Sequence, residues 1–158
     1  MTPAAFPAGR LAGVDYGRRR IGVAVCDATR ILASPLCVRE TAGDDAADAA
    51  FFRGLVAEED LVGFVVGLPI HADGRPSDMS REAERFGSWL ERVTGLPVAF
   101  HDERWTSHEA AGLLAGAGLS RGRKKARADA VAAQVILASW LERGSAADAG
   151  GAPGAHDG

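Results

Sequence analysis

Three acidic positions stand out because each lies at the end of a predicted core element. Asp15 ends an apolar strand, Asp102 and Glu103 follow another, and Asp129 lies in the opening turns of a helix whose inward stripe it shares. Carboxylates avoid such places unless they are paired, hydrogen-bonded or bound to a metal. If the three elements meet at one edge of a sheet, the carboxylates could hold one or two Mg²⁺ ions together with substrate phosphates.

Each acid also has a purely structural explanation. Asp15 can open a turn, a role that aspartate often fills. Asp102 or Glu103 can pair with Arg104, and Asp129 can stabilise the start of its helix through the helix dipole. Taken together, the three sites favour a functional interpretation, because the same edge of the sheet is implicated each time.

The basic residues are segregated from the acidic ones along the chain. The net charge of −3 argues against a nucleic-acid partner, but residues 40–60 contain seven acids and one base, whereas residues 119–129 contain five bases and one acid. A further cluster comprises Arg18, Arg19 and Arg20. Such segregation leaves one face free to meet a polyanion, although a solvated surface is the simpler interpretation of charge alone.

The order of the predicted elements decides the fold class. Apolar periodicity and capping residues predict strands at 10–16, 20–27, 30–40, 61–67 and 96–101, and helices at 44–59, 77–95, 106–118 and 125–142. Three strands with short connections predict a β-meander, and the alternation that follows predicts βαβ units. We therefore expect an α/β fold with a five-stranded mixed sheet and helices on both faces.

Length and composition limit the remaining possibilities. A chain of 158 residues with 47% hydrophobic residues is typical of one globular domain, which we expect at residues 9–143 between disordered tails at 1–8 and 144–158. No apolar run approaches the ~20 residues of a membrane span, and no signal peptide is evident, so we expect a cytoplasmic protein without a membrane partner. The two cysteines lack the spacing of a metal site.

Four motifs, in order, carry a resemblance to a known family. They are Val14-Asp15-Tyr16-Gly17 with Arg20-Ile-Gly-Val-Ala, Val65-Val-Gly-Leu-Pro69 with Asp73-Gly74, Asp102-Glu-Arg-x-Thr106-Ser, and Lys125-x3-Asp129-x2-Ala-Ala133-x2-Ile-Leu137. The chain resembles the YqgF (RuvX) family over residues 9–143. The resemblance implies an RNase H-like fold and a bacterial cytoplasmic nuclease that acts on precursor small-subunit ribosomal RNA. The alternative description of the family is a Holliday junction resolvase acting on branched DNA.

The resemblance also implies roles for individual residues. Asp15, Glu103 and Asp129 would be the catalytic acids that bind Mg²⁺, or Mn²⁺ in its place. Four basic side chains would contact phosphates and add sequence-independent affinity; these are Arg19, Arg20, Arg104 and Lys125.

One departure leaves the second acid open. Other RNase H-like resolvases carry an acid after the fourth strand, where this chain has Gly67-Leu68-Pro69. The second carboxylate must then come from the fifth strand, as Glu103, which we favour, or as Asp102, which would otherwise lie among the substrate-binding residues.

Two other functions compete with a nuclease. The pattern Asp15-x-Gly17-x4-Gly22 also occurs in phosphate-binding hairpins of the actin and sugar-kinase type, but those proteins need two such domains and this chain has room for one. An RNA-binding assembly factor that has lost its chemistry is the other alternative, and the presence of all three acids argues against it. Whether the protein is a monomer or a homodimer stays open.

Overall fold

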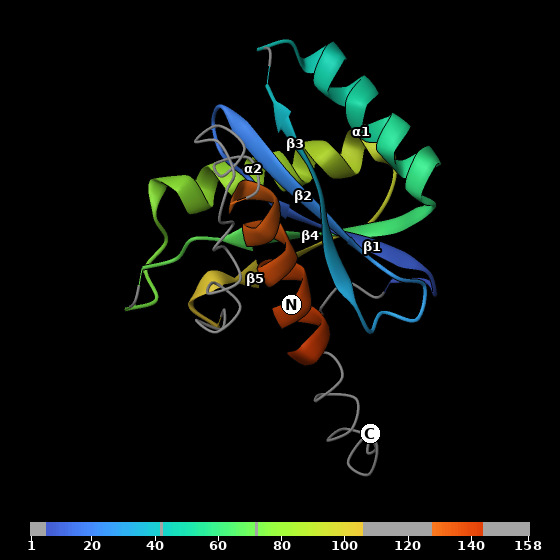
Figure 1. Ribbon diagram of the computed structural model, residues 1–158. Coiled ribbons are helices and arrows are strands. Elements are labelled where there is room, and N and C mark those ends of the chain that lie inside the picture. Colours follow the sequence, from blue (N-terminus) through green and yellow to red (C-terminus); the bar gives the residue numbers. More distant parts are fainter. Residues whose placement is uncertain (1–5, 42, 72, 106–127, 144–158) are drawn as a thin grey trace, which may run out of the picture.

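The computed structural model describes residues 6–41, 43–71, 73–105 and 128–143. Its strands form one mixed sheet in the order β3-β2-β1-β4-β5 (Figure 1). The elements are β1 (Arg10–Asp15), β2 (Arg20–Cys26), β3 (Ala33–Glu40), α1 (Asp45–Glu59), β4 (Leu61–Leu68), α2 (Asp78–Thr94), β5 (Val98–Asp102), the 3₁₀ turn η1 (Glu103–Trp105) and a helix over residues 128–143. β1, β2 and β3 are antiparallel neighbours, and β4 and β5 run parallel to β1. The predicted α/β fold is confirmed.

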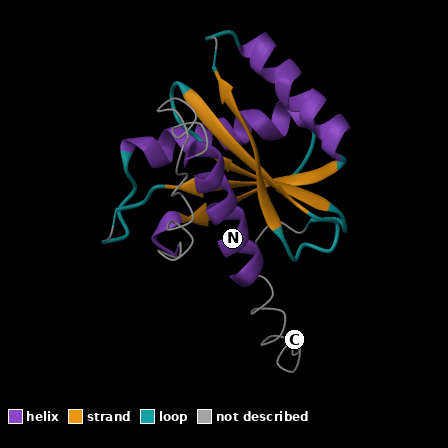
Figure 2. Cartoon of the chain, in the orientation of Figure 1, coloured by secondary structure: helices purple, strands orange, loops and turns teal. Residues whose placement is uncertain are grey.

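Helices cover both faces of the sheet, as the sequence predicts (Figure 2). On one face, Phe52 of α1 and Leu90 of α2 pack against strand residues such as Val14. On the other face, helix 128–143 packs against Leu11 and its neighbours through Ile136, Leu137 and Leu141. Side chains alternate between the two faces along a strand. Asp15, four residues beyond Leu11, therefore lies on the same face as helix 128–143.

Helix 128–143 lies unusually close to the strands because glycines lie beneath it. A Cβ atom on Gly13 would come within 2.6 Å of the Leu137 Cβ and 2.7 Å of the Ala133 carbonyl oxygen. A Cβ atom on Gly22 would collide with the carbonyl oxygen of Asp129. The glycines therefore allow the helix backbone to rest directly on the sheet.

Two strands begin later than their apolar patterns predict. β3 begins at Ala33 rather than at position 30, because the Asp27 carboxylate accepts hydrogen bonds from the N–H groups of Ile31 and Leu32 at 2.9 and 2.8 Å. β5 begins at Val98 rather than at position 96, because the chain first leaves α2 through Gly95, whose φ is 74°. In both cases a local turn takes up residues that are apolar enough for a strand.

Several predictions fall on residues that the structure does not describe. These are the tails at 1–5 and 144–158, the helix at 106–118, and the first turn of the last helix with Lys125. Among the described residues, no helix is long and apolar enough to span a membrane.

Gly13→Ala is expected to destabilise the fold. The added methyl group collides with the main chain of helix 128–143, and overpacking of this kind costs about 1–3 kcal/mol of unfolding free energy. Gly54→Ala is the matched control, because Gly54 lies exposed within α1 with no atom near the position of a Cβ. It should stabilise the helix by roughly 0.5–1 kcal/mol. Urea denaturation of both variants measures the difference, and equal effects would contradict the close packing.

Candidate active site

The carboxyl ends of β1, β4 and β5 meet at one edge of the sheet and carry the acidic residues to it. Asp15 pairs with Gly22 on β2, and the residue before it, Val14, pairs with Val66 on β4. Asp15 is therefore level with Gly67, which in turn pairs with His101 on β5. Gly22, Asp15, Gly67 and His101 therefore form one row across β2, β1, β4 and β5, and a glycine lies on each side of Asp15.

Asp15 is held in an environment that opposes its charge. Burial, and after it the nearby charges of Glu103 and Asp129, together raise the pKa of its carboxyl group to about 7. The structure thus brings together the three acids that the sequence singles out, closely enough for their charges to interact.

Glu103 reaches this site from the turn that follows β5. Its Oε2 atom lies 2.9 Å from the position that a Cβ atom on Gly67 would take. The carboxylate therefore covers the end of β4, where this chain lacks a side chain. Burial raises the pKa of Glu103, and the charge of Asp102 contributes in the same direction.

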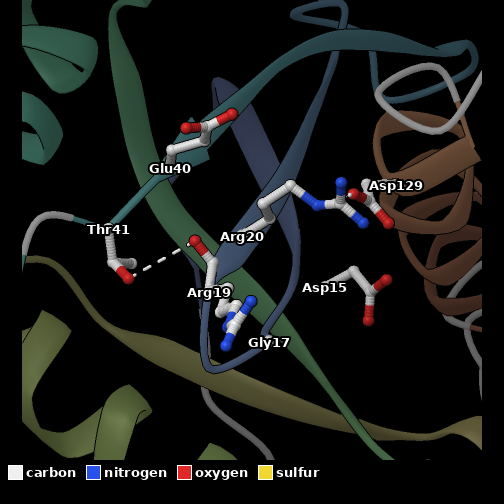
Figure 3. A pocket seen from close by; sticks show the side chains of 7 residues that line it. All are labelled: Asp15, Gly17, Arg19, Arg20, Glu40, Thr41 and Asp129. Atoms are coloured by element: carbon white, nitrogen blue, oxygen red, sulfur yellow. Dashed lines mark hydrogen bonds and ion pairs between the residues drawn. The ribbon is translucent and has the colours of Figure 1, made fainter. Parts of the chain in front are cut away.

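Asp129 enters from the first described turn of helix 128–143 and faces Arg20. The Arg20 Nε lies 2.9 Å from the Asp129 Oδ2. This oxygen is buried, yet no described residue makes a hydrogen bond of good geometry to it, so the contact is an ion pair alone. Figure 3 shows Arg20 extended toward Asp129, with the Asp15 carboxylate pointing into the same space.

A pocket of about 660 Å³ lies in front of these residues. It is lined by Asp15, Gly17, Arg19, Arg20, Glu40, Thr41 and Asp129. The sequence analysis missed Glu40 and Thr41. Both follow from the meander, because Arg20 pairs with Glu40 and the Thr41 N–H donates to the Arg19 carbonyl at 2.9 Å. A register prediction for β2 and β3 could have found them.

The three consecutive arginines after Asp15 have three different surroundings. Arg18 points away from the pocket and donates hydrogen bonds to both carboxylate oxygens of Glu82 on α2. Arg20 is paired with Asp129. The Arg19 side chain lines the pocket and makes no hydrogen bond or ion pair with the part of the chain that the structure describes. Arg19 is therefore the cation of this cluster that is available to an anionic ligand.

Asp102 and Arg104 lie beside Glu103 but interact with each other. The Arg104 Nε lies 2.8 Å from the Asp102 Oδ2, and this pairing lowers the pKa of Asp102. Glu103 and Arg104 also line a second hollow of about 650 Å³, together with His71 of the loop between β4 and α2. Lys125, the remaining predicted site residue, lies outside the described residues.

The donor set suits a hard divalent cation, which prefers carboxylate oxygens. The buried Asp129 oxygen without a hydrogen bond and the guanidinium group beside it show that this place requires positive charge. Within the described ranges, no three carboxylate, histidine or cysteine side chains are close enough to ligate one ion together. Asp15, Glu103 and Asp129 therefore fit a divalent cation in chemistry and converge at one edge of the sheet, but they do not close around one ion, and Arg20 is the positive charge beside Asp129 in this structure.

Comparison with known proteins identifies close relatives. The profile of the RuvX family, described as a Holliday junction resolvase, matches residues 9–143. A protein of Rhodopirellula baltica named "Putative pre-16S rRNA nuclease" is 50% identical over 138 residues, which cover 87% of this chain and 79% of that protein. A protein of the same name from Chromobacterium violaceum is 46% identical, with 82% of this chain and 94% of that protein covered.

Solved structures support the fold independently. Thermus thermophilus RuvC in complex with a Holliday junction substrate superposes with a TM-score of 0.52 at 15% identity, covering 87% of this chain and 97% of that chain. The yeast mitochondrial Holliday junction resolvase superposes with a TM-score of 0.50 at 12% identity, covering 87% and 80%. At these identities the likeness concerns the fold alone, and it confirms the predicted RNase H-like architecture.

The raised pKa of Asp15 predicts how stability depends on pH without metal. Between an unfolded value near 4 and the folded value of about 7, the folded protein holds the proton more tightly, so stability falls as pH rises through this window. Asp15→Asn removes this loss and should raise the unfolding free energy by about 2–4 kcal/mol at pH 8, with a much smaller gain at pH 5. Urea denaturation in EDTA at both pH values measures the effect.

The control for this prediction is Glu84→Gln, an exposed carboxylate on α2. It should change stability little at either pH. An Asp15→Asn protein that is less stable than the parent at pH 8 would instead mean that Asp15 serves mainly to form the turn before Gly17.

Proposed function

The chain belongs to the RuvX family, a family of nucleases, and we propose that it is a metal-dependent endonuclease that processes precursor small-subunit ribosomal RNA in the cytoplasm. The observation that supports this most directly is that acids from separate elements converge at one edge of the sheet. Asp15 and Asp129 line one pocket, and the Glu103 carboxylate lies over Gly67, which is level with Asp15. Two relatives that are 50% and 46% identical to this chain over the aligned residues are named "Putative pre-16S rRNA nuclease".

In this proposal Asp15, Glu103 and Asp129 hold Mg²⁺, or Mn²⁺ in its place. A bound metal of this kind activates water as a nucleophile and stabilises the charge on the leaving oxygen. The chain itself supplies the placement of the acids, their burial, and the repulsion among them that favours a cation. We assign the role of the second acid to Glu103, because its carboxylate lies over Gly67 beside Asp15. The Asp102 carboxylate is instead hydrogen-bonded to Arg104.

The proposed contacts to phosphate come from the basic residues around the pocket. Arg19 is available in the structure as it stands. Arg20 neutralises Asp129, and it becomes available to a phosphate once a metal takes over that carboxylate. Lys125 is included because it belongs to the sequence motif around Asp129. Contacts to phosphate position the strand but carry no sequence information, so this set of residues suits RNA and DNA alike.

Branched DNA is the second candidate substrate, because the description of the matching family names a Holliday junction resolvase. The two substrates differ in shape, and a direct comparison decides between them. Purified protein should be incubated with a precursor ribosomal RNA transcript and with a four-way DNA junction, each with and without Mg²⁺.

We expect Mg²⁺-dependent cleavage of the RNA. Asp15→Asn, Glu103→Gln and Asp129→Asn should each reduce cleavage by orders of magnitude, because the metal that activates water is no longer held. Glu84→Gln again serves as the control and should cleave at the parent rate. A well-folded Asp15→Asn protein that cleaves at the parent rate would refute the proposal. Cleavage of the DNA junction but not of the RNA would mean that branched DNA is the substrate.

Arg19→Ala should weaken binding of single-stranded RNA and reduce its salt dependence. Each phosphate contact contributes roughly 0.7 to the slope of log affinity against log salt concentration for single strands. Arg18→Ala removes the same charge from the neighbouring position, but Arg18 is held by Glu82, so the slope should change little. Fluorescence anisotropy in EDTA, at several salt concentrations, measures both slopes. Equal changes in the two variants would mean that the pocket does not direct phosphate binding.

A further inference from the structure

The side chains of Asp102 and Arg104 close a tight turn around Glu103. The Asp102 Oδ1 accepts a hydrogen bond from the Arg104 backbone N–H at 2.9 Å and another from its Nε at 3.0 Å. The Asp102 Oδ2 accepts from the Arg104 Nε at 2.8 Å and Nη2 at 2.5 Å. A planar guanidinium group that binds a carboxylate at several points fixes the geometry of both partners.

This turn determines where Glu103 lies. Asp102 is the last residue of β5 and pairs with Leu68 of β4, so the turn is anchored to the sheet. The residue between the two partners then projects back over β4, where the Glu103 Oε2 lies 2.9 Å from the position of a Cβ on Gly67. On its other side, the Arg104 Nη1 lies 3.3 Å from the position of a Cβ on Gly74, in the loop before α2. Arg104 is thus packed between β5 and that loop.

We propose that the Asp102–Arg104 pair is a positioning device that holds the Glu103 carboxylate over Gly67, beside Asp15, where it would serve as a ligand to a divalent cation. Neither partner is then a metal ligand or a main contact to phosphate. The inference rests on the proposed function, because it assigns Glu103 to a metal site. It revises the sequence-based role of Arg104 as a phosphate-binding residue and that of Asp102 as a substrate-binding residue or an alternative acid.

The chain contains the same motif a second time, and it serves as an internal control. The Arg75 backbone N–H donates to the Asp73 Oδ1 at 3.0 Å, and its Nε donates to the Asp73 Oδ2 at 2.7 Å. The residue between these partners is Gly74, which carries no side chain to position. The Arg75 side chain is 79% exposed, against 33% for Arg104.

Arg104→Lys and Asp102→Asn distinguish positioning from phosphate binding. Lysine keeps the positive charge but cannot bind a carboxylate at two points, and asparagine keeps the size of aspartate but weakens the pairing. If the pair positions Glu103, both variants should damage the metal site in the same way. If Arg104 binds phosphate instead, Arg104→Lys should be mild, and Asp102→Asn should weaken the hold of Asp102 on Arg104 and tighten binding of nucleic acid.

The main measurement is Mn²⁺ affinity in the absence of nucleic acid, from the electron paramagnetic resonance signal of free Mn²⁺. We expect Arg104→Lys and Asp102→Asn each to weaken Mn²⁺ binding by about 10- to 100-fold, the usual range for residues that orient a metal ligand. The double variant should be no weaker than either single variant, because the two residues act as one unit. Arg75→Lys should bind Mn²⁺ as the parent does. Melting temperatures in EDTA establish that each variant is folded.

Kinetics give a second, separate measurement. For RNA cleavage, kcat should fall in both variants, while KM and the salt dependence of RNA binding stay at the parent values. Unchanged Mn²⁺ affinity in Arg104→Lys, tighter RNA binding by Asp102→Asn, or a parent protein that binds no Mn²⁺ would each overturn the inference. A parent that binds Mn²⁺ but cleaves neither RNA nor branched DNA would refute the proposed function alone, because the Mn²⁺ measurements would still test the positioning role.

Discussion

Helix 128–143 can lie directly on the sheet because the residues beneath it have no side chains. Gly13 faces Leu137, Gly67 faces Ile136, and Gly22 faces the main chain of Asp129. A Cβ atom on Gly13 or Gly22 would force the helix main chain away from the strands, and a Cβ atom on Gly67 would displace the Ile136 side chain. The close approach matters most at the amino end of the helix, because the helix carries Asp129 while β1 carries Asp15. The distance between backbone layers therefore sets the distance between two carboxylates.

The electrostatics of the site follow from this packing. Carboxylates drawn together in a half-buried place destabilise the free protein, as the raised pKa of Asp15 indicates. Arg20 offsets part of the repulsion through its ion pair with Asp129. A bound divalent cation would relieve the same repulsion more fully, and a ligand that binds the folded state alone also stabilises it. In the proposed site, the free energy that burial and repulsion of these carboxylates cost the fold would be recovered when a cation binds.

Much of the arrangement could be predicted from the sequence, because the ends of apolar elements determine it. Asp15 ends an apolar strand and Asp129 lies on the inward stripe of a helix, so their convergence follows from the βββαβαβ order. The sequence analysis favours Glu103 over Asp102, but the order of elements alone does not decide between them. Side chains alternate in direction along a strand, and an uncertainty of one residue in where β5 ends exchanges the two.

The arginine cluster after Asp15 shows the same limit. Sequence analysis treats Arg18, Arg19 and Arg20 as one basic patch, but in the structure they lie at a reversal of the chain in three different surroundings. Arg18 pairs with Glu82 and Arg20 with Asp129, whereas Arg19 lines the pocket. Their directions depend on the turn between β1 and β2 and on the Asp129 carboxylate, which is distant in sequence. Charge counts along a chain do not contain this information.

The glycine at position 67 and the glutamate at position 103 are best understood as one feature. The resemblance to RNase H-like resolvases implies an acid after the fourth strand, where Gly67 stands here. A side chain at 67 would displace the Glu103 carboxylate from its present place, since even a Cβ there would lie 2.9 Å from the Glu103 Oε2. Neighbouring strands are about 4.8 Å apart, and a glutamate side chain spans that distance from the end of β5. In the proposed site, the Glu103 carboxylate therefore reaches from the end of β5 the place over β4 that a side chain at 67 would otherwise occupy, and the bare glycine is what leaves that place open.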